Sequence, residues 1–349
     1  GLISTIKYSI NGQDHSSSHT TPHAIRIQEL LAQMKEAACT HVFMEVSSHA
    51  IDQQRIAGLQ FKGAAFTNIT HDHLDYHKDF KDYLYTKKKL FDQLGSEAFA
   101  LYNRDDKNGQ VMVQNCKASK YSYSLKSMSD FKTRIIEHDL QGMQLEIRGE
   151  EFWIRMVGEF NAYNLLAVYA ISFLLDLEHL DIVRALSSLQ SVEGRFQHLE
   201  YKGITAIVDY AHTPDALLNV LKTVNAVRNR NEQLICVLGC GGDRDKEKRP
   251  VMARIACEHS NKVVITSDNP RTEDPLAIIT EIEQGFNGTN YQIEVDRKAA
   301  IKIAIEESES QDMILIAGKG HENYQLIGDK KYPFDDAEEV QHQLEVCAG

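Results

Sequence analysis

The feature that most constrains the fold is the regular alternation of short apolar runs with amphipathic helical stretches in the second half of the chain. The apolar runs, rich in Val, Ile and Leu, are Ile204–Asp209, Leu234–Leu238, Lys262–Thr266 and Met313–Ala317. The helical stretches are Asp215–Val227, Arg249–His259, Pro275–Gly285 and Arg297–Glu306, with a further helix predicted after Asp335. Strands that alternate with helices of this length indicate a mostly parallel sheet with helices on both faces, a doubly wound α/β fold.

Shorter and less regular elements of the same kind are predicted in the first half of the chain. A helix is expected to start at Thr20-Thr21-Pro22, because proline is favoured in a first helical turn. Residues up to about Gln13 show no strong periodicity, so no element is predicted there. The other expected elements are strands at His41–Glu45, Gly63–Thr67, Gln144–Arg148 and Phe152–Met156 and helices at Phe80–Leu94, Asn161–Leu175 and Asp181–Leu189.

The length of the chain predicts two domains. At 349 residues it exceeds the usual size of a single domain. The first predicted unit ends around Glu193-Gly194-Arg195. We therefore assign residues 1–199 to a first α/β domain and residues 200–349 to a second, doubly wound domain.

Composition argues against several classes of protein. The net charge of −12 argues against binding to nucleic acid or to an anionic membrane, and no apolar run approaches the roughly 20 residues that span a bilayer. The six cysteines form no C-x-x-C pair, which argues against a structural zinc site or a disulfide framework and for reduced thiols. We therefore expect a cytoplasmic monomer whose partners are small molecules, with no nucleic acid and no membrane among them.

The most unusual loop follows the predicted strand Gly63–Thr67 and contains His71, His73, Asp75 and His77. This density of metal-type ligands has two interpretations. A metallohydrolase would bind zinc through the three histidines, but its H-x-H-x-D-H signature needs a histidine directly after Asp75, where this chain has a tyrosine. The other interpretation is a magnesium site, in which one histidine and carboxylate-type oxygens hold the cation against a phosphate. Glu45, at the end of a strand, could supply such an oxygen or could cap the next helix.

Nine short motifs in a fixed order resemble those of the Mur ligases. Each motif alone is weak, but nine in the same order are specific, and the resemblance extends over essentially all 349 residues. The motifs are Met44–His49, Thr67-Asn68 with Asp72–His77, Tyr83-x-x-x-Lys87, Asn161-x-x-Asn164, Glu193-Gly-Arg195, Asp209–Pro214, Gly239–Arg244, Asp268–Arg271 and Gly318–Glu322.

This resemblance implies both a fold and a reaction. The fold is a truncated central ATPase-type domain, residues 1–199, followed by a C-terminal Rossmann-like domain, residues 200–349. The reaction uses ATP to phosphorylate a substrate carboxylate, and an amine then attacks the acyl phosphate. The expected enzyme adds meso-diaminopimelate to UDP-N-acetylmuramoyl-L-alanyl-D-glutamate in peptidoglycan synthesis, with Mg²⁺ as cofactor and ATP as a substrate.

The resemblance also assigns the magnesium ligands, which are Glu45, His73 and Lys87. Family members carry this lysine as a carbamate, because an ammonium cannot ligate a cation whereas a carbamate offers anionic oxygens. Repulsion from Lys88 and Lys89 would help to keep the amine neutral for carbamylation, but these neighbours also leave the register open by one residue. Without the flanking motifs, Lys87 would be taken for an ordinary solvated lysine of a helix.

Three further groups of residues are assigned by the resemblance. The ATP-binding residues are Asn161, Asn164, Arg195, Asp209 and His212, and those for the UDP-sugar dipeptide are Thr20, Thr21, Ser47, Gln53 and Arg55. Helix capping remains the alternative for Asn161, Thr20 and Thr21. The residues for meso-diaminopimelate are Arg244, Asp268, Asn269, Arg271, Gly318 and Glu322.

Two residues of the last group suit diaminopimelate chemically. The guanidinium of Arg271 offers a planar fork to the distal carboxylate, which lysine lacks, and the carboxylate of Glu322 suits the distal ammonium. The nearest alternative among enzymes is a lysine-adding or other Mur-type ligase, and Asp268–Arg271 argues against it.

The sequence departs from the family in one respect. No G-x-x-x-x-G-K-[ST] loop occurs in it, since the pair Gly318-Lys319 is followed by Gly320. In the family this loop, preceded by a uridine-binding domain, comes before the region that matches Gly1. A P-loop cradles the phosphates of ATP, so we expect the chain as given to bind ATP poorly and to be inactive alone. The alternatives from other classes are the metallohydrolase that uses His71, His73 and His77, and a catalytically silent fragment.

Overall fold

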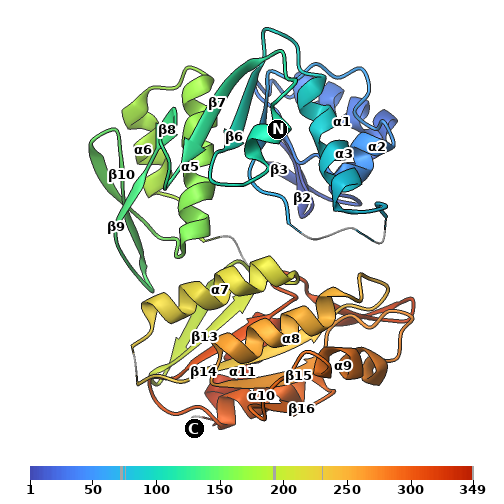
Figure 1. Cartoon of the computed structure of the whole chain (residues 1–349), viewed down its shortest axis with the longest axis vertical. Coiled ribbons are helices and arrows are strands. Elements are labelled where there is room, and N and C mark those ends of the chain that lie inside the picture. The colour runs from blue at the N-terminus through green and yellow to red at the C-terminus, as the bar shows by residue number, and fades with distance from the viewer. Residues whose placement is uncertain (71–73, 75, 192–193, 230, 348–349) are drawn as a thin grey trace. The chain divides into compact units, whose positions relative to one another are not determined.

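The structure, a computed structural model, describes residues 1–70, 74, 76–191, 194–229 and 231–347. The chain forms two compact units (Figure 1). The first comprises Gly1–Ile69 and Tyr76–Lys132, and the second comprises Thr70–Asp75 and Thr133–Gly349. Among the described residues, no helix is both long enough and apolar enough to cross a membrane.

The first unit contains two four-stranded sheets. The first has the order β3-β2-β1-β4. In it, β2 pairs antiparallel with both β1 and β3, and β4 pairs in parallel with β1. The other sheet, with the order β5-β6-β7-β8, is parallel throughout. The strands are β1 (Leu2–Ile3), β2 (Lys7–Ile10), β3 (Gln13–Ser16), β4 (Phe43–Met44), β5 (Gly63–Phe66), β6 (Phe99–Asn103), β7 (Ser119–Ser124) and β8 (Phe131–Lys132). The helices are α1 (Ala24–Glu36), α2 (Ser48–Asp52), α3 (Phe80–Asp92) and α4 (Gly109–Met112).

Helix α1 covers the first of these sheets with one apolar face. Its buried residues are spaced by three and four positions, as an amphipathic helix requires; they are Ile27, Leu30 and Met34. The helix begins after His23, whose side chain accepts a hydrogen bond from the backbone of the first turn. The predicted start at Thr20-Thr21-Pro22 and the capping alternative for the two threonines are therefore wrong.

The second unit begins with an antiparallel sheet and two helices. The sheet has the order β11-β10-β9, and its strands are β9 (Arg134–Asp139), β10 (Gly142–Ile147) and β11 (Glu150–Ile154). The helices α5 (Glu159–Leu174) and α6 (His179–Ser187) follow. The predicted strands Gln144–Arg148 and Phe152–Met156 are confirmed as β10 and β11, and the predicted helices Asn161–Leu175 and Asp181–Leu189 as α5 and α6. Their bounds are shifted by one or two residues.

A six-stranded sheet with the order β12-β13-β17-β14-β15-β16 dominates the second unit. Only its edge strand β12 is antiparallel to its neighbour. The strands are β12 (Gln197–Tyr201), β13 (Ile204–Asp209), β14 (Leu234–Cys240), β15 (Lys262–Ser267), β16 (Tyr291–Ile293) and β17 (Met313–Ala317). A two-stranded hairpin, β18 (Tyr324–Ile327) and β19 (Lys330–Pro333), follows β17. The doubly wound sheet predicted from the apolar runs is confirmed.

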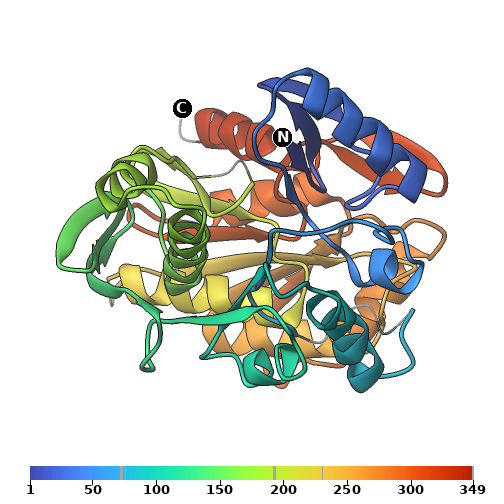
Figure 2. The same cartoon turned by 90° about the horizontal axis from the view of Figure 1, so that it is seen from above.

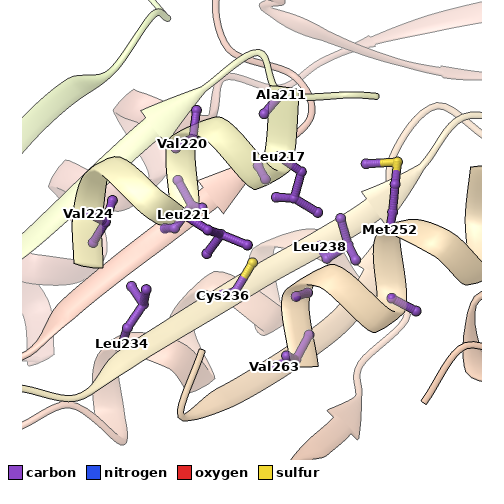
Figure 3. Close-up of a cluster of buried hydrophobic side chains, with 14 of the residues drawn as sticks. Ala211, Leu217, Val220, Leu221, Val224, Leu234, Cys236, Leu238, Met252 and Val263 are labelled. Atoms are coloured by element: carbon purple, nitrogen blue, oxygen red, sulfur yellow. The ribbon is translucent and has the colours of Figure 1, made fainter. Parts of the chain in front are cut away.

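Helices cover both faces of this sheet, as Figure 2 shows. Alternate strand residues point to two separate cores, one shared with α7–α9 and the other with α10 and α11. Figure 3 shows Leu221 of α7 and Met252 of α8 on the face of the sheet to which Cys236 of β14 points. The helices are α7 (Pro214–Val227), α8 (Lys248–His259), α9 (Pro275–Glu283), α10 (Arg297–Glu306) and α11 (Asp336–Cys347).

This topology decides where a site can form. Strands β13, β14, β15 and β17 run parallel, so their carboxyl ends and the loops that follow them share one edge of the sheet. In open α/β sheets, ligands bind in loops at that edge.

Candidate functional site

A threonine holds the carboxylate of Glu45, which follows β4. Its Oε2 accepts hydrogen bonds from the backbone N–H of Thr5 at 3.0 Å and from the Thr5 hydroxyl at 2.5 Å. The hydroxyl oxygens of Thr5 and Thr20 are 3.0 Å apart. Helix α2 is capped instead by Ser47, whose hydroxyl accepts from a backbone N–H three residues later. The capping alternative for Glu45 is therefore wrong, and Thr5 fixes this exposed carboxylate.

Thr21 lies at the centre of the residues predicted to bind the UDP-sugar dipeptide. Its hydroxyl donates to the carbonyl oxygen of Glu45 at 2.7 Å and accepts from the N–H of Ser47 at 3.0 Å. Arg55 Nη1 donates to the carbonyl oxygen of Thr21 at 2.7 Å. Two other guanidinium nitrogens of Arg55 donate to Gln53 Oε1, at 3.0 and 2.6 Å. The structure thus joins these predicted residues and Glu45 in one hydrogen-bond network.

Of the ligand-rich loop, His77 is described, whereas His71, His73 and Asp75 lie outside the described residues. His77 is buried, with Nε2 2.9 Å from the hydroxyl of Ser48 and Nδ1 3.6 Å from Oδ2 of Asp82. Both ring nitrogens face partners in the protein, so this histidine is poorly placed to bind zinc. Within the described part of the chain, no three His, Cys, Asp or Glu side chains are grouped to hold a metal ion. The metallohydrolase interpretation gains no support from these residues.

The three adjacent lysines of helix α3 differ in burial and in their partners. Lys87 is half-buried, and its ammonium lies 5.5 Å from the centroid of the Tyr83 ring. Lys88 is buried, and its ammonium is hydrogen-bonded to the carboxylate of Asp92 one turn later. Lys89 is exposed. Lys88 therefore points inward and is held by Asp92, whereas the ammonium of Lys87 is the more accessible of the two.

The two asparagines predicted to contact ATP lie on one face of the first turns of α5, three residues apart. Asn161 Nδ2 donates to the carbonyl oxygen of Val157 at 2.8 Å. The N-cap residue is Gly158, with a φ of +98° and no side chain to form a cap bond. The capping alternative for Asn161 is therefore wrong. Asn164 is exposed.

Three other predicted ATP-binding residues gather where β13 ends. The buried carboxylate of Asp209 accepts from the N–H of Phe196 at 2.7 Å. Burial raises the pKa of Asp209 to about 6, although this hydrogen bond and the charge of Arg195 act in the opposite direction. The guanidinium of Arg195 lies 4.9 Å from the ring centroid of Tyr210. The rings of Tyr210 and His212 are 4.6 Å apart, so one aromatic side chain links the arginine and the histidine.

Five of the six residues predicted to bind the amino acid lie together after β15 and β17. Asn269 Nδ2 donates to Glu322 Oε2 at 2.7 Å. A Cβ at Gly318 would stand 2.6 Å from Oδ2 of Asp268, and the φ of this glycine is +125°. Both facts require glycine at this position, because any other residue would be strained and would displace the carboxylate.

The backbone of Arg271 is held in a left-handed conformation, with a φ of +52°. Its N–H donates to the carbonyl oxygen of Leu326 at 3.0 Å, and its own carbonyl accepts from the N–H of Gly328 at 2.7 Å. The hairpin β18–β19 therefore maintains this unusual backbone, which would otherwise cost energy. Arg271 Nη1 donates to the carbonyl oxygen of Gly242 at 2.7 Å. No hydrogen bond between described residues uses Nη2, which leaves one prong of the guanidinium for a ligand.

Arg244, the sixth predicted residue, approaches Arg271 at a glycine. A Cβ on Gly241 would stand 2.8 Å from Arg271 Nη1 and 3.8 Å from Cγ of Arg244, so the two arginines flank this position. Arg244 is exposed, and its Nη1 donates to the carbonyl oxygen of Asp243 at 3.1 Å.

Sequence reasoning missed two residues of this cluster. Lys319 is fully buried, and its ammonium contacts Asn269 and Glu322. Gln325 Nε2 donates to the carbonyl oxygen of Asp268 at 2.7 Å. The sequence offers one signal, a lysine between two glycines at the end of an apolar strand, but that pattern alone does not identify the partners of the lysine.

Comparison with known proteins identifies the family of this chain. Residues 1–172 match the family described as the Mur ligase middle domain, and residues 194–320 match the one described as the Mur ligase, glutamate ligase domain. A protein of Cytophaga hutchinsonii, named UDP-N-acetylmuramoyl-L-alanyl-D-glutamate–2,6-diaminopimelate ligase, is 52% identical over 340 residues, which are 96% of this chain and 70% of the relative. One of the same name from Bacteroides thetaiotaomicron is 50% identical over 97% of this chain and 71% of its own length.

A solved structure leads to the same family. It is titled as the structure of UDP-N-acetylmuramoyl-L-alanyl-D-glutamate–2,6-diaminopimelate ligase, is 34% identical, and superimposes with a TM-score of 0.63 over 96% of this chain and 70% of its own. Two domain families, close relatives and a shared fold therefore agree with the family that the motifs indicate. This chain belongs to the Mur ligase family.

Proposed function

We propose that this chain acts as a UDP-N-acetylmuramoyl-L-alanyl-D-glutamate–2,6-diaminopimelate ligase, an ATP-dependent enzyme of peptidoglycan synthesis. The observation that carries the proposal is the cluster of Asn269, Arg271 and Glu322 at the carboxyl edge of the six-stranded sheet. It offers a guanidinium and a carboxylate to an amino acid whose far end has both a carboxylate and an ammonium. Relatives 50% and 52% identical to this chain have this name.

In the proposed reaction, the γ-phosphoryl group of ATP passes to a carboxylate of the glutamyl residue and gives ADP and an acyl phosphate. An amine of diaminopimelate then attacks the acyl carbon. The carbon–oxygen bond to phosphate breaks as the amide forms, so phosphate leaves with the electron pair and the amine loses a proton. Water alone does not promote this condensation, and the protein must hold the two substrates in contact and stabilise the developing charge.

A carboxylate of the first unit suits a magnesium ion. When bound, magnesium neutralises charge on the phosphates during phosphoryl transfer. Glu45 suits this cation, because its carboxylate is exposed and is fixed in place by Thr5, and Mg²⁺ prefers oxygen ligands. We assign His73 and a carbamate on Lys87 as the other ligands, on the strength of the motifs that contain them.

We assign the nucleotide of ATP to the second unit. Asn161 and Asn164 present amides from one face of α5 toward the base, and Arg195 offers a guanidinium to a phosphate. Asp209 and His212, at the end of β13, are assigned to the ribose side. The support is that Asp209 accepts from Phe196, the neighbour of Arg195, and that His212 and Arg195 both pack against the ring of Tyr210.

We assign the UDP-sugar dipeptide to the network around Thr21. The assigned residues are Thr20, Thr21, Ser47, Gln53 and Arg55. The support is that this network includes Glu45, so a substrate bound there lies next to a proposed magnesium ligand. Transfer of a phosphoryl group to the dipeptide requires this proximity.

The functional domains, in this proposal, are residues 1–199 and residues 200–349. The chain, in this proposal, works as a monomer. It works in the cytoplasm, where ATP and nucleotide-linked substrates are supplied.

The proposal is tested by product analysis with the ligase that contains this chain. Incubation with ATP, Mg²⁺, UDP-N-acetylmuramoyl-L-alanyl-D-glutamate and meso-diaminopimelate should give a product heavier by one diaminopimelate minus water, together with ADP and phosphate. Omitting ATP should abolish the product. Formation of the lysine adduct in place of the diaminopimelate adduct would contradict the proposed substrate but not the ligase chemistry.

A further inference from the structure

Lys319, directly after β17, is fully buried, and its ammonium has three partners. Nζ lies 2.5 Å from the carbonyl oxygen of Tyr324, 3.2 Å from Oδ1 of Asn269 and 3.2 Å from Oε2 of Glu322. An ammonium has three N–H donors, and three acceptors surround this one. Burying a lysine is costly unless its charge is paired and its donors are satisfied, and both conditions are met here.

These bonds fix the orientation of two side chains assigned to the amino-acid site. Oδ1 of Asn269 accepts from Lys319 and from the N–H of Leu326 at 2.8 Å, so its amide nitrogen must face Glu322. Both Lys319 and Asn269 donate to Oε2 of Glu322. Oε1 accepts no hydrogen bond from any described residue, and the side chain of Glu322 is 16% exposed. One oxygen of this carboxylate is therefore occupied, and the other is open.

We propose that Lys319 is a positioning residue of the amino-acid site, an inference that rests on the proposed function. Its charge compensates Oε2 of Glu322 and holds the carboxylate in one orientation, in which Oε1 faces the distal ammonium of diaminopimelate. Lys319 does not touch the substrate, because it is fully buried, and it acts through Glu322 and Asn269.

The same ammonium also holds the hairpin that supports Arg271. Lys319 binds the carbonyl oxygen of Tyr324 at the start of β18, and two later residues of the hairpin bind the backbone of Arg271. Glu322, which is proposed to bind the distal ammonium of the substrate, and Arg271, which is proposed to bind its distal carboxylate, therefore both depend on Lys319. Preorganised sites depend on such supporting contacts.

A double-mutant cycle tests this inference in the ligase that contains this chain. The variants are Lys319→Met, Glu322→Gln and the two combined, and the measured quantities are kcat, KM for diaminopimelate, KM for ATP and the melting temperature. Lys319→Met should raise KM for diaminopimelate at least about tenfold and change KM for ATP less than about twofold. In the Glu322→Gln background, the same substitution should raise it less than about threefold, because the residue through which it acts has lost its charge.

The matched control is Lys262→Met. Lys262 starts β15 at the opposite edge of the sheet, where its ammonium lies 2.5 Å from Oε2 of Glu307, so this substitution also removes an ion pair. It should leave both KM values unchanged. Lys319→Gln, which keeps N–H donors but removes the charge, is a second variant and should behave as Lys319→Met does.

Several results would overturn the inference. Equal effects of Lys319→Met with and without Glu322→Gln would show that the lysine does not act through this carboxylate. Failure of both Lys319 variants to fold at the assay temperature would assign the lysine to domain stability alone. A wild-type ligase that does not use diaminopimelate would overturn the proposed function and this inference together, whereas additive effects in a ligase that uses it overturn the inference only.

Discussion

At the scale of single residues, the carboxyl edge of the six-stranded sheet collects buried charge. Asp209, Asp268 and Lys319 are 4%, 7% and 0% exposed. The carboxylate of Asp209 accepts a hydrogen bond from a backbone N–H, and the ammonium of Lys319 donates to three acceptors. Charges held in this way resist reorganisation when a ligand arrives, as binding sites for ionic substrates require.

The raised pKa of Asp209 implies that the free energy of unfolding depends on pH. Its folded-state pKa is raised by burial to about 6 from 3.8, so the folded chain retains this proton to a higher pH than the unfolded chain does. The stabilisation from that proton is present below about pH 4 and is lost as the pH rises through about 6. Asp209→Asn remains neutral and can still accept from Phe196. Its unfolding free energy relative to wild type should therefore increase between pH 4 and pH 7, by up to about 3 kcal/mol.

Urea unfolding of both proteins across this pH range measures the difference. If the difference stays constant with pH, the charged carboxylate is tolerated at this position, and the raised pKa is not a property of the folded protein.

The proposed role of Lys87 in binding magnesium can be tested through enzyme activity. In the ligase that contains this chain, Lys87→Ala should lower kcat/KM at least about a hundredfold, because a carbamate ligand of magnesium is lost. Added short-chain carboxylates should restore part of the activity by supplying the missing oxygens. Lys89→Ala, which removes the exposed lysine two residues away, is the control and should keep its activity. Full activity of Lys87→Ala would remove this lysine from the site.

At the scale of elements, two loops of the second unit meet backbone to backbone. A Cβ on Gly194 would stand 2.1 Å from the backbone nitrogen of His321, and one on Gly320 would stand 2.6 Å from the carbonyl oxygen of Gly194. The N–H of Tyr210 donates to that same carbonyl oxygen at 3.0 Å. The loop before β12 is therefore fastened both to the end of β13 and to the loop after β17.

This contact predicts the cost of adding one methyl group. Gly194→Ala should lower the unfolding free energy by at least about 3 kcal/mol, because the φ of +67° is unfavourable for alanine and the methyl collides with backbone atoms. Gly149→Ala is the matched control: its φ is +86°, but its Cβ would meet no atom within 4 Å, so about 1 kcal/mol is expected. Equal losses for the two variants in chemical denaturation would mean that the two loops are not packed closely in solution.

The elements also show which sequence signals were sufficient. The core strands β13, β14, β15 and β17 were predictable because both faces are buried, so each is a nearly continuous apolar run. The strands β1, β2 and β3 were missed, because they have two to four residues and β3 is fully exposed. Thr21 was taken for a helix start, because its actual partner, the carbonyl oxygen of Glu45, lies 24 residues later.

At the scale of the whole molecule, the order of motifs identified the family more reliably than any single residue. The chain covers about 70% of the length of its relatives, and its motifs occur across both matched domains. The contacts of Lys319 were not predictable, because Asn269 lies 50 residues away and the third partner is a backbone carbonyl. Local patterns predict elements, whereas contacts between distant loops require the folded chain.

In the proposed function, Arg271 selects the amino acid by its distal carboxylate. Lysine lacks that group, so it would leave Nη2 of this half-buried guanidinium without a partner, at a cost of about 3 kcal/mol, the lower end of the range for a buried charge. Arg271→Ala should therefore raise KM for diaminopimelate steeply while barely changing KM for ATP. Arg271→Lys should not restore binding, because a lysine ammonium lacks the planar fork with which the guanidinium binds the carbonyl oxygen of Gly242 through Nη1 and offers a second nitrogen to the distal carboxylate.

The most direct test of the central claim is the ratio of kcat/KM for meso-diaminopimelate to kcat/KM for lysine, measured in the ligase that contains this chain at one pH and one ATP concentration. The account predicts a ratio of at least about 10²–10³ in favour of diaminopimelate, falling toward one in Arg271→Ala. A wild-type ratio near one would contradict the assignment of Asp268-Asn269-Pro270-Arg271 as the part of the site that selects diaminopimelate.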